Sequence, residues 1–166
     1  MNSILKQALR YSAWATKALI SAARSLSEEQ LNAPAPGYGS VLSTLRHVIR
    51  SDAGYLGMLN GDRPAWAKVE IETGDLDQLE AYVDETHALW EQLLAEPIDA
   101  SRKLVLDDGA YECSASVVWT QAIHHANAHR EQVRAALRGF DVEPPDVQPW
   151  EYALDAGCAR WLREPS

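Results

Sequence analysis

The stretch SASVVWTQAIHHANAHREQVRAALRG, residues 114–139, has the apolar spacing of one long helix. Its apolar residues recur at steps of three and four, which places them on one stripe of a helix. The stripe consists of Val118, Trp119, Ile123, Ala126, Val133, Ala136 and Leu137. Ser114 or Ser116 could cap the first turn, and Gly139 suits the C-terminal cap. The pattern predicts a helix over about 114–138.

Three earlier segments repeat the helical spacing, at about 2–26, at about 40–60 and from Asp75 to the stop at Pro97. Residues 27–30 form a short capping-box sequence, and Asp75 is a good N-cap with Gln78 three positions on. Prolines and glycines between residues 34 and 39 predict a loop. Four helices with one long crossover, between the second and the third, indicate a four-helix bundle.

Two smaller elements complete the prediction. Residues 102–113 contain two short apolar runs around Asp107-Asp108-Gly109, the pattern of a β-hairpin. After Pro144-Pro145, a short helix is expected over about 150–162. We therefore expect an all-α fold in a single domain over residues 1–166: a four-helix bundle with a small β-hairpin before the last long helix and a short C-terminal helix.

Composition limits the function classes. The chain has 166 residues, 46% apolar and 23% charged, as in an ordinary globular domain. Its net charge of −9 argues against nucleic acid and anionic membranes, because such partners need a basic face. No run approaches the roughly 18 apolar residues of a membrane span, and no signal peptide is recognised. Cys113 and Cys158 cannot make a disulfide framework, so we expect a reduced, cytoplasmic protein.

The histidines are the candidate functional residues. His125 and His129 are four positions apart, so both lie on one face of the predicted helix, close enough to share a metal ion. The helical wheel directs the adjacent His124 outward. His47, on the second predicted helix, is the candidate third ligand. His87 is interpreted as a hydrogen-bonded residue of the core or its edge.

The face of the second helix around His47 favours a cavity wall over a core or a solvent face. Its other residues are small or uncharged: Ser40, Ser43, Ser51, Gly54 and Met58. An open metal site needs such room. A bundle whose histidines are only hydrogen-bonded remains the alternative, because no spacing rule links residues on separate helices.

Arg130 falls near the centre of the apolar stripe of its helix, and a buried guanidinium must be paired. Asp52, on the apolar stripe of the second helix, is a candidate ion-pair partner. The alternative role for Arg130 is a clamp for an anion or a substrate. Ser51, Asp52 and Arg130 are therefore the candidate pocket residues around the metal ligands.

Three segments together resemble a known family. The run of residues 123–133, with His125, three residues, His129-Arg130 and then Gln132, resembles the signature helix of the DinB/YfiT superfamily. Residues 45–49 with Asp52 are similar to the family's second-helix segment, and residues 11–14 to its first helix. The hairpin before the last long helix also fits, so the resemblance spans nearly the whole chain.

The resemblance implies a four-helix bundle that holds a divalent metal, usually zinc or nickel, on His47, His125 and His129. It also implies a homodimer and thiol-dependent chemistry, as in transferases that use bacillithiol or mycothiol and in maleylpyruvate isomerases. Many relatives have glycine where this chain has Glu131. The wheel places Glu131 outward, so we expect the metal site to be retained.

The leading hypothesis is a metal-dependent S-transferase in which a metal-activated, low-molecular-weight thiol attacks a small electrophile. One alternative is a hydrolase that uses a metal-bound hydroxide. Another is a non-catalytic metal-binding or scaffold bundle, in which the histidines fix the helices. The sequence identifies no catalytic side chain beyond the ligands, and three histidines accept several transition metals.

Overall fold

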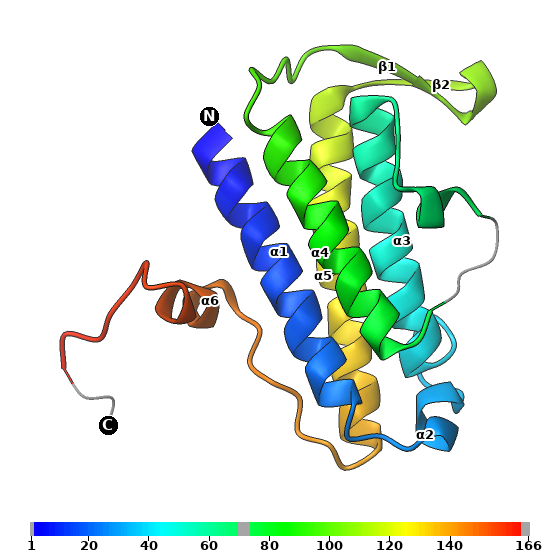
Figure 1. Ribbon diagram of the computed structural model, residues 1–166, viewed down its shortest axis with the longest axis vertical. Helices are drawn as coiled ribbons and strands as arrows, with labels where there is room; N and C mark the ends of the chain where they lie inside the picture. Colours follow the sequence, from blue (N-terminus) through cyan, green and yellow to red (C-terminus); the bar gives the residue numbers. More distant parts are fainter. Residues whose placement is uncertain (1, 70–73, 164–166) are drawn as a thin grey trace.

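The computed structural model describes residues 2–69 and 74–163, and four long helices make up most of it (Figure 1). They are α1 (Asn2–Ala23), α3 (Val41–Asn60), α4 (Leu76–Leu93) and α5 (Ala115–Gly139). α3 packs against α4 and α5, and α1 also packs against both. The predicted four-helix bundle is confirmed. In the described part of the chain, no helix is long and apolar enough to cross a membrane.

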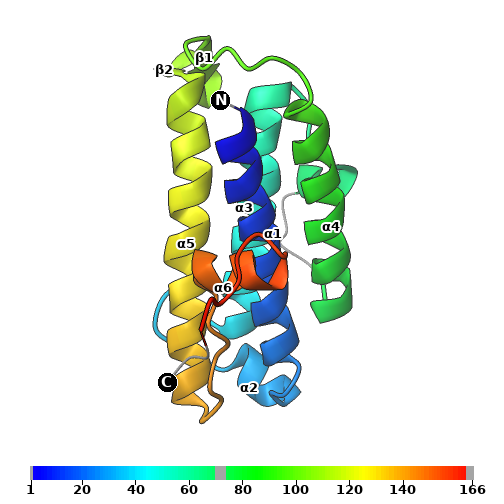
Figure 2. The same cartoon turned by 90° about the vertical axis from the view of Figure 1, so that its left-hand side faces the viewer.

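The smaller elements are attached to the ends and one side of the bundle. α2 (Glu28–Asn32) precedes α3, and a 3-10 turn, η1 (Ala65–Lys68), follows it. The predicted hairpin consists of β1 (Lys103–Leu106) and β2 (Tyr111–Ser114), which are antiparallel and joined through a 3-10 turn, η2 (Asp107–Gly109). α6 (Pro149–Asp155) lies across α1 and α5 (Figure 2). Its Tyr152 packs on Tyr11 and Trp14 of α1.

Polar side chains fix where the helices begin. Ser40 accepts a hydrogen bond from the backbone N–H of Ser43, whose side chain accepts one from the backbone N–H of Ser40. Asp75 and Gln78 make the same reciprocal pair at α4. Such capping boxes satisfy backbone donors that the first helical turn leaves free. They start α3 and α4 where the sequence predicts.

The predicted cap of α5 at Gly139 is wrong. Gly139 is the last helical residue, and Asp141, with φ 58°, takes the left-handed position after it. The N–H of Val142 donates to the carbonyl of Leu137 at 3.0 Å, which closes the turn. Leu137 is buried and Val142 packs against the same core. The left-handed Asp141 and the packing of Leu137 and Val142 against one core therefore set the end of α5, and they override the conformational preference of glycine.

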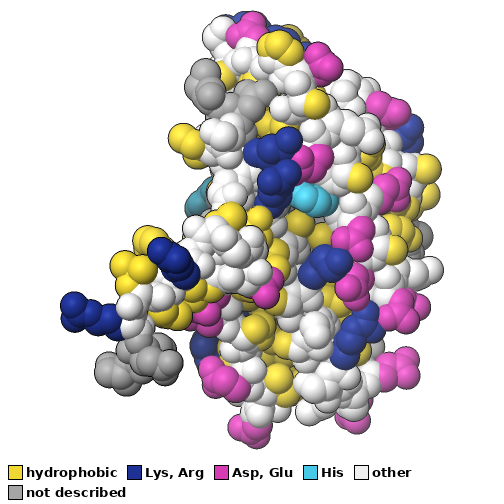
Figure 3. All heavy atoms as spheres, turned by 60° about the vertical axis from the view of Figure 1, so that its left-hand side comes forward, with side chains coloured by type: hydrophobic (Ala, Val, Ile, Leu, Met, Phe, Trp, Pro, Cys, Tyr) yellow, Lys and Arg dark blue, Asp and Glu magenta, His cyan; other side chains and the backbone are white. Residues whose placement is uncertain are grey.

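The C-terminal helix is shorter than predicted. α6 ends at Asp155, because Gly157 adopts φ 68° and the N–H of Cys158 closes a turn on the carbonyl of Ala153. Trp161 and Leu162, expected inside this helix, lie in an exposed segment beyond it. Figure 3 shows one face of the molecule, on which acidic and basic side chains are interspersed over the helical bundle. Apolar side chains are exposed on the C-terminal part that projects from the bundle.

The apolar core forms two clusters along the bundle. One includes Leu19, Leu45 and Leu137, and the other, next to the hairpin, includes Trp90 and Trp119. The two tryptophan rings lie 5.0 Å apart, centre to centre. Burial of these side chains supplies the main stabilisation of the bundle.

A polar layer separates the two clusters. α1, α3 and α4 contribute Ser12, Asp52 and Thr86, which border a cavity of about 20 Å³. Ser12 and Thr86 are buried, and the side-chain oxygen of Thr86 has no hydrogen-bond partner among the described residues. Arg130 reaches this layer from α5 through its bond to Ser12. Polar side chains from all four long helices therefore lie inside the bundle, next to the apolar residues that line the rest of this cavity.

Candidate metal centre

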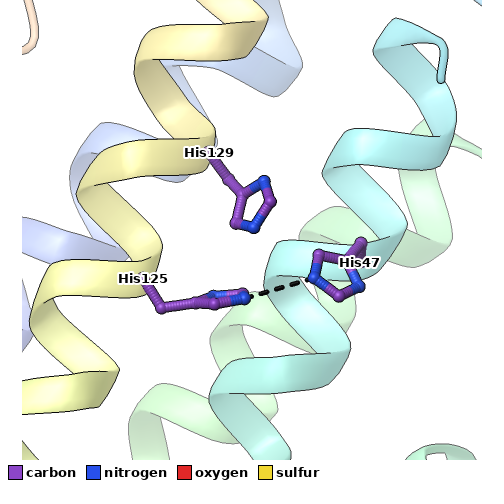
Figure 4. A group of neighbouring side chains, drawn as sticks. All are labelled: His47, His125 and His129. Carbon is purple, nitrogen blue, oxygen red and sulfur yellow. Dashed lines mark hydrogen bonds between the residues drawn. The ribbon is translucent and has the colours of Figure 1, made fainter. Parts of the chain in front are cut away.

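The three histidines selected from the sequence lie together between two helices (Figure 4). His47 comes from α3, and His125 and His129 come from successive turns of α5. One ring nitrogen of each lies within 4.8 Å of the others, and all three side chains are half-buried. The Nε2 atoms of His47 and His125 are 3.2 Å apart. His124 is exposed, as the wheel predicts.

The spacing and charge of these ligands fit a divalent metal. Two nitrogens bound tetrahedrally to zinc at about 2.0–2.1 Å are about 3.3 Å apart, close to the observed separation of His47 and His125. Burial lowers the pKa of His125 to about 4, and the neighbouring His129 and His47 contribute. His125 is therefore neutral at pH 7, with a lone pair available to a metal. The donor set matches the nitrogen ligands that zinc and nickel accept.

Aromatic and amide side chains surround the ligands. The ring of Tyr38 stacks on His47, with centroids 3.8 Å apart and planes 20° apart. The ring of Tyr55 meets His125 edge-on at 5.5 Å. Gln132 Oε1 lies 2.8 Å from Nδ1 of His129. The sequence did not predict these contacts; only Gln132, three positions after His129 on one helix, has a spacing that could have indicated its role.

Arg130 is buried as predicted, but its partners differ from the expected one. Its Nη1 donates to the carbonyl oxygen of Ser12 at 3.2 Å, to Ser12 Oγ at 2.9 Å and to Thr16 Oγ1 at 3.3 Å. Its Nη2 donates to Asn127 Oδ1, and the guanidinium lies 5.3 Å from the centre of the Tyr11 ring. Arg130 thus joins α5 to α1. Its neighbours His125 and His129 instead meet His47 of α3.

Asp52 makes no ion pair with Arg130 among the described residues. Its Oδ2 accepts a hydrogen bond from Trp90 Nε1 at 3.1 Å. Burial raises the pKa of Asp52 to about 6, opposed by the Trp90 bond and the more distant charge of Arg130. The pairing considered from the sequence is therefore wrong, because α1 supplies the acceptors for Arg130, and a helical wheel of α3 and α5 contains no information about α1.

Ser51 lies one helical turn after His47 on α3 and is half-buried. The described contacts join neither Ser51 nor Asp52 nor Arg130 directly to the three histidines. Asp52 lines the cavity of the polar layer. Ser51 is the candidate pocket residue that shares a helix face with His47.

The remaining candidate side chains lie away from the histidine group. Glu131 is exposed and pairs with Arg134 at 2.8 Å, so it points outward as predicted. His87 is half-buried on α4, with Nε2 3.9 Å from Glu91, and burial lowers its pKa. Cys113 is buried in strand β2 of the hairpin, and Cys158 is exposed after α6.

The chain matches a known protein family. A family model described as the DinB superfamily matches residues 13–143, a segment that contains all three histidines and ends before α6. No curated protein matches the chain. The matched segment includes the parts of α1, α3, α4 and α5 that form the body of the bundle.

Proposed function

The chain belongs to the DinB superfamily, and on that premise we propose that it is a divalent-metal-dependent enzyme that activates a thiol for attack on a small electrophile. The observation that carries the proposal is the convergence of His47, His125 and His129 within 4.8 Å. Three protein ligands leave a coordination position free, which is the arrangement of a catalytic rather than a structural zinc site. When bound, a zinc or nickel ion would lower the pKa of a coordinated thiol and present its thiolate.

The chain's own residues define where the substrates enter. Half-buried imidazoles from α3 and α5 hold one side of the centre. Tyr38, 44% exposed, borders it from the loop before α3 and offers an aromatic surface to a substrate. In the transfer step, the thiol releases its proton to solvent, its sulfur forms a bond to an electrophilic carbon, and the group displaced from that carbon leaves with its bonding electron pair.

The thiol has to be a separate cosubstrate, because neither cysteine is near the histidines. Cys113 is buried next to the start of α5, and His125 lies ten residues beyond the first residue of that helix, about 15 Å along its axis. Cys158 is exposed in the segment after α6. This separation supports a low-molecular-weight thiol as the second substrate.

The first test is metal content. Tag-free protein is analysed by mass spectrometry after zinc or nickel loading and dialysis, beside a His125→Ala, His129→Ala double variant. A His124→Ala variant is the matched control, because His124 is an exposed histidine on the same helix. We expect about one metal per chain in the parent and the control and almost none in the double variant. A parent that binds no metal at neutral pH would refute the proposal.

The second test addresses the reaction. Metal-loaded protein is incubated with small thiols and a panel of electrophiles, and loss of free thiol is followed with time. We expect thiol consumption that the double variant does not catalyse. Metal binding without thiol consumption, but with release of acid from ester or amide substrates, would replace transfer with hydrolysis. Metal binding that only raises the melting temperature would indicate a scaffold role.

A further inference from the structure

The loop between α2 and α3 reaches the histidine group. It is tied at its base, since the N–H of Ala35 donates to the carbonyl of Gly39 at 2.6 Å. It is also tied to α3, because the hydroxyl of Ser43 donates to the carbonyl of Tyr38 at 2.9 Å. These bonds hold Gly37 and Tyr38 in fixed positions next to side chains of α3 and α5.

Gln132 determines how His129 can present itself to a metal. The side-chain oxygen of Gln132 is an acceptor, so the proton of the neutral His129 ring is favoured on Nδ1, 2.8 Å away. The lone pair is then on Nε2, the nitrogen at the other edge of the ring. Bonds of this kind fix the tautomer and the ring orientation of metal-binding histidines.

Gly37 holds Gln132 against His129. A Cβ atom on Gly37 would lie 2.9–3.0 Å from the Cβ, Cγ and Cδ atoms of Gln132, closer than such atoms pack. The backbone of Gly37, with φ 117°, is also in a conformation that residues with a side chain rarely adopt. Only glycine lets the loop lie flat on the Gln132 side chain, which leaves that side chain little room to rotate.

Tyr38 restrains a second ligand from the same loop. Its ring stacks on His47 at 3.8 Å and meets His129 edge-on at 5.8 Å. Two consecutive loop residues thus contact the surroundings of two of the three ligands. Gly37 and Tyr38 precede His129 by 92 and 91 residues in the sequence.

We infer that Gln132 is a positioning residue of the metal centre, held by Gly37, and that the Gly37-Tyr38 step sets the orientation of His129 and His47 before a metal binds. The inference rests on the proposed metal function and extends it to residues outside the ligand set. It assigns to Gly37 a role in metal affinity, through a contact that a side chain would break.

The test measures zinc affinity by competition with a chelator, and Co²⁺ absorption as a report of ligand geometry. Gln132→Ala removes the acceptor, Gln132→Glu retains one, and Gly37→Ala displaces Gln132. Gln92→Ala, an exposed glutamine on α4, is the matched control. We expect Gln132→Ala and Gly37→Ala to weaken zinc binding roughly 10- to 100-fold and to change the Co²⁺ spectrum. Gln132→Glu should restore wild-type affinity, and the control should not change it.

The outcomes separate the two proposals. If the parent binds no zinc, both fail. If the parent binds zinc and Gln132→Ala binds it within twofold of the parent, only the positioning role fails. If Gln132→Glu binds as weakly as Gln132→Ala, the acceptor argument is wrong. Melting of the metal-free proteins is measured in parallel, so that a folding defect of Gly37→Ala is seen directly, and the Gln132 variants then decide the result.

Discussion

Asp52 is an acid placed where its charge costs stability, and replacing it with asparagine should stabilise the protein at neutral pH. The residue lies in the polar layer between the two apolar clusters, and its carboxylate accepts one hydrogen bond, from Trp90 Nε1. An asparagine oxygen can accept the same bond at the same position. The substitution therefore removes the charge and retains the contact.

The size of the effect follows from the pKa of Asp52, which burial raises from 3.8 to about 6. Between about pH 4 and 6 the folded chain holds this proton and the unfolded chain has released it, so stability falls as pH rises through that window. Above pH 6 the destabilisation is complete, and a shift of about two units corresponds to about 3 kcal/mol. We expect Asp52→Asn to exceed the parent in unfolding free energy by about 1 kcal/mol at pH 4.5 and about 3 kcal/mol at pH 7.5.

The assay is urea unfolding followed by circular dichroism, at both pH values, in a chelator so that metal does not contribute. Asp108→Asn is the control, because Asp108 is exposed in the hairpin turn and its change should have the same small effect at both pH values. An Asp52→Asn variant that is less stable than the parent at pH 7.5 would refute the reasoning. It would show that Arg130 stabilises the Asp52 charge by more than burial destabilises it.

Three further predictions concern the site and its support. Zinc at 100 times its dissociation constant should raise the unfolding free energy of the parent by about 2.7 kcal/mol and leave His125→Ala unchanged, as calorimetry with and without metal will show. Arg130→Met should lose about 2–4 kcal/mol in urea unfolding, because it leaves the buried Ser12 hydroxyl of α1 without this donor; Arg130→Lys should not restore it. Gly139→Ala should gain about 0.5–1 kcal/mol in the same assay, because Gly139 is helical and the space beside it is open.

Helix starts could be predicted from the sequence and some helix ends could not, for a physical reason. Ser40 and Asp75 cap their helices through residues three positions later, so the whole signal is local. The end of α5 depends on Leu137 and Val142 packing into one core, and that core includes residues from other helices. Glycine at position 139 only favours a left-handed cap there, and the tertiary contacts place the left-handed residue at Asp141 instead.

The same distinction applies to Arg130. Its burial follows from its own helix, since the wheel places it among apolar residues. Its partners do not, because Ser12 and Thr16 are more than 110 residues away in the sequence and their polar atoms carry no pattern that points to an arginine. Asp52 was the natural candidate partner for Arg130 on charge alone. In the structure its carboxylate instead accepts a hydrogen bond from Trp90. Polar contacts between helices follow the packing geometry, which residue types by themselves do not specify.

The histidine group combines features that the local sequence predicts with a feature that depends on the tertiary structure. His125 and His129 share a helix face, so their proximity is fixed once the helix is predicted. His47 could be added because its face of α3 lacks both charge and bulk, which is a property of the sequence. Gly37 could not be added, because its contact with Gln132 depends on a left-handed backbone conformation in a loop. A glycine in a proline-rich loop predicts a turn, and it does so equally well whether or not the glycine contacts Gln132. Its role follows only from the distance between Gly37 and Gln132, and the affinity of Gly37→Ala for zinc tests whether that distance matters.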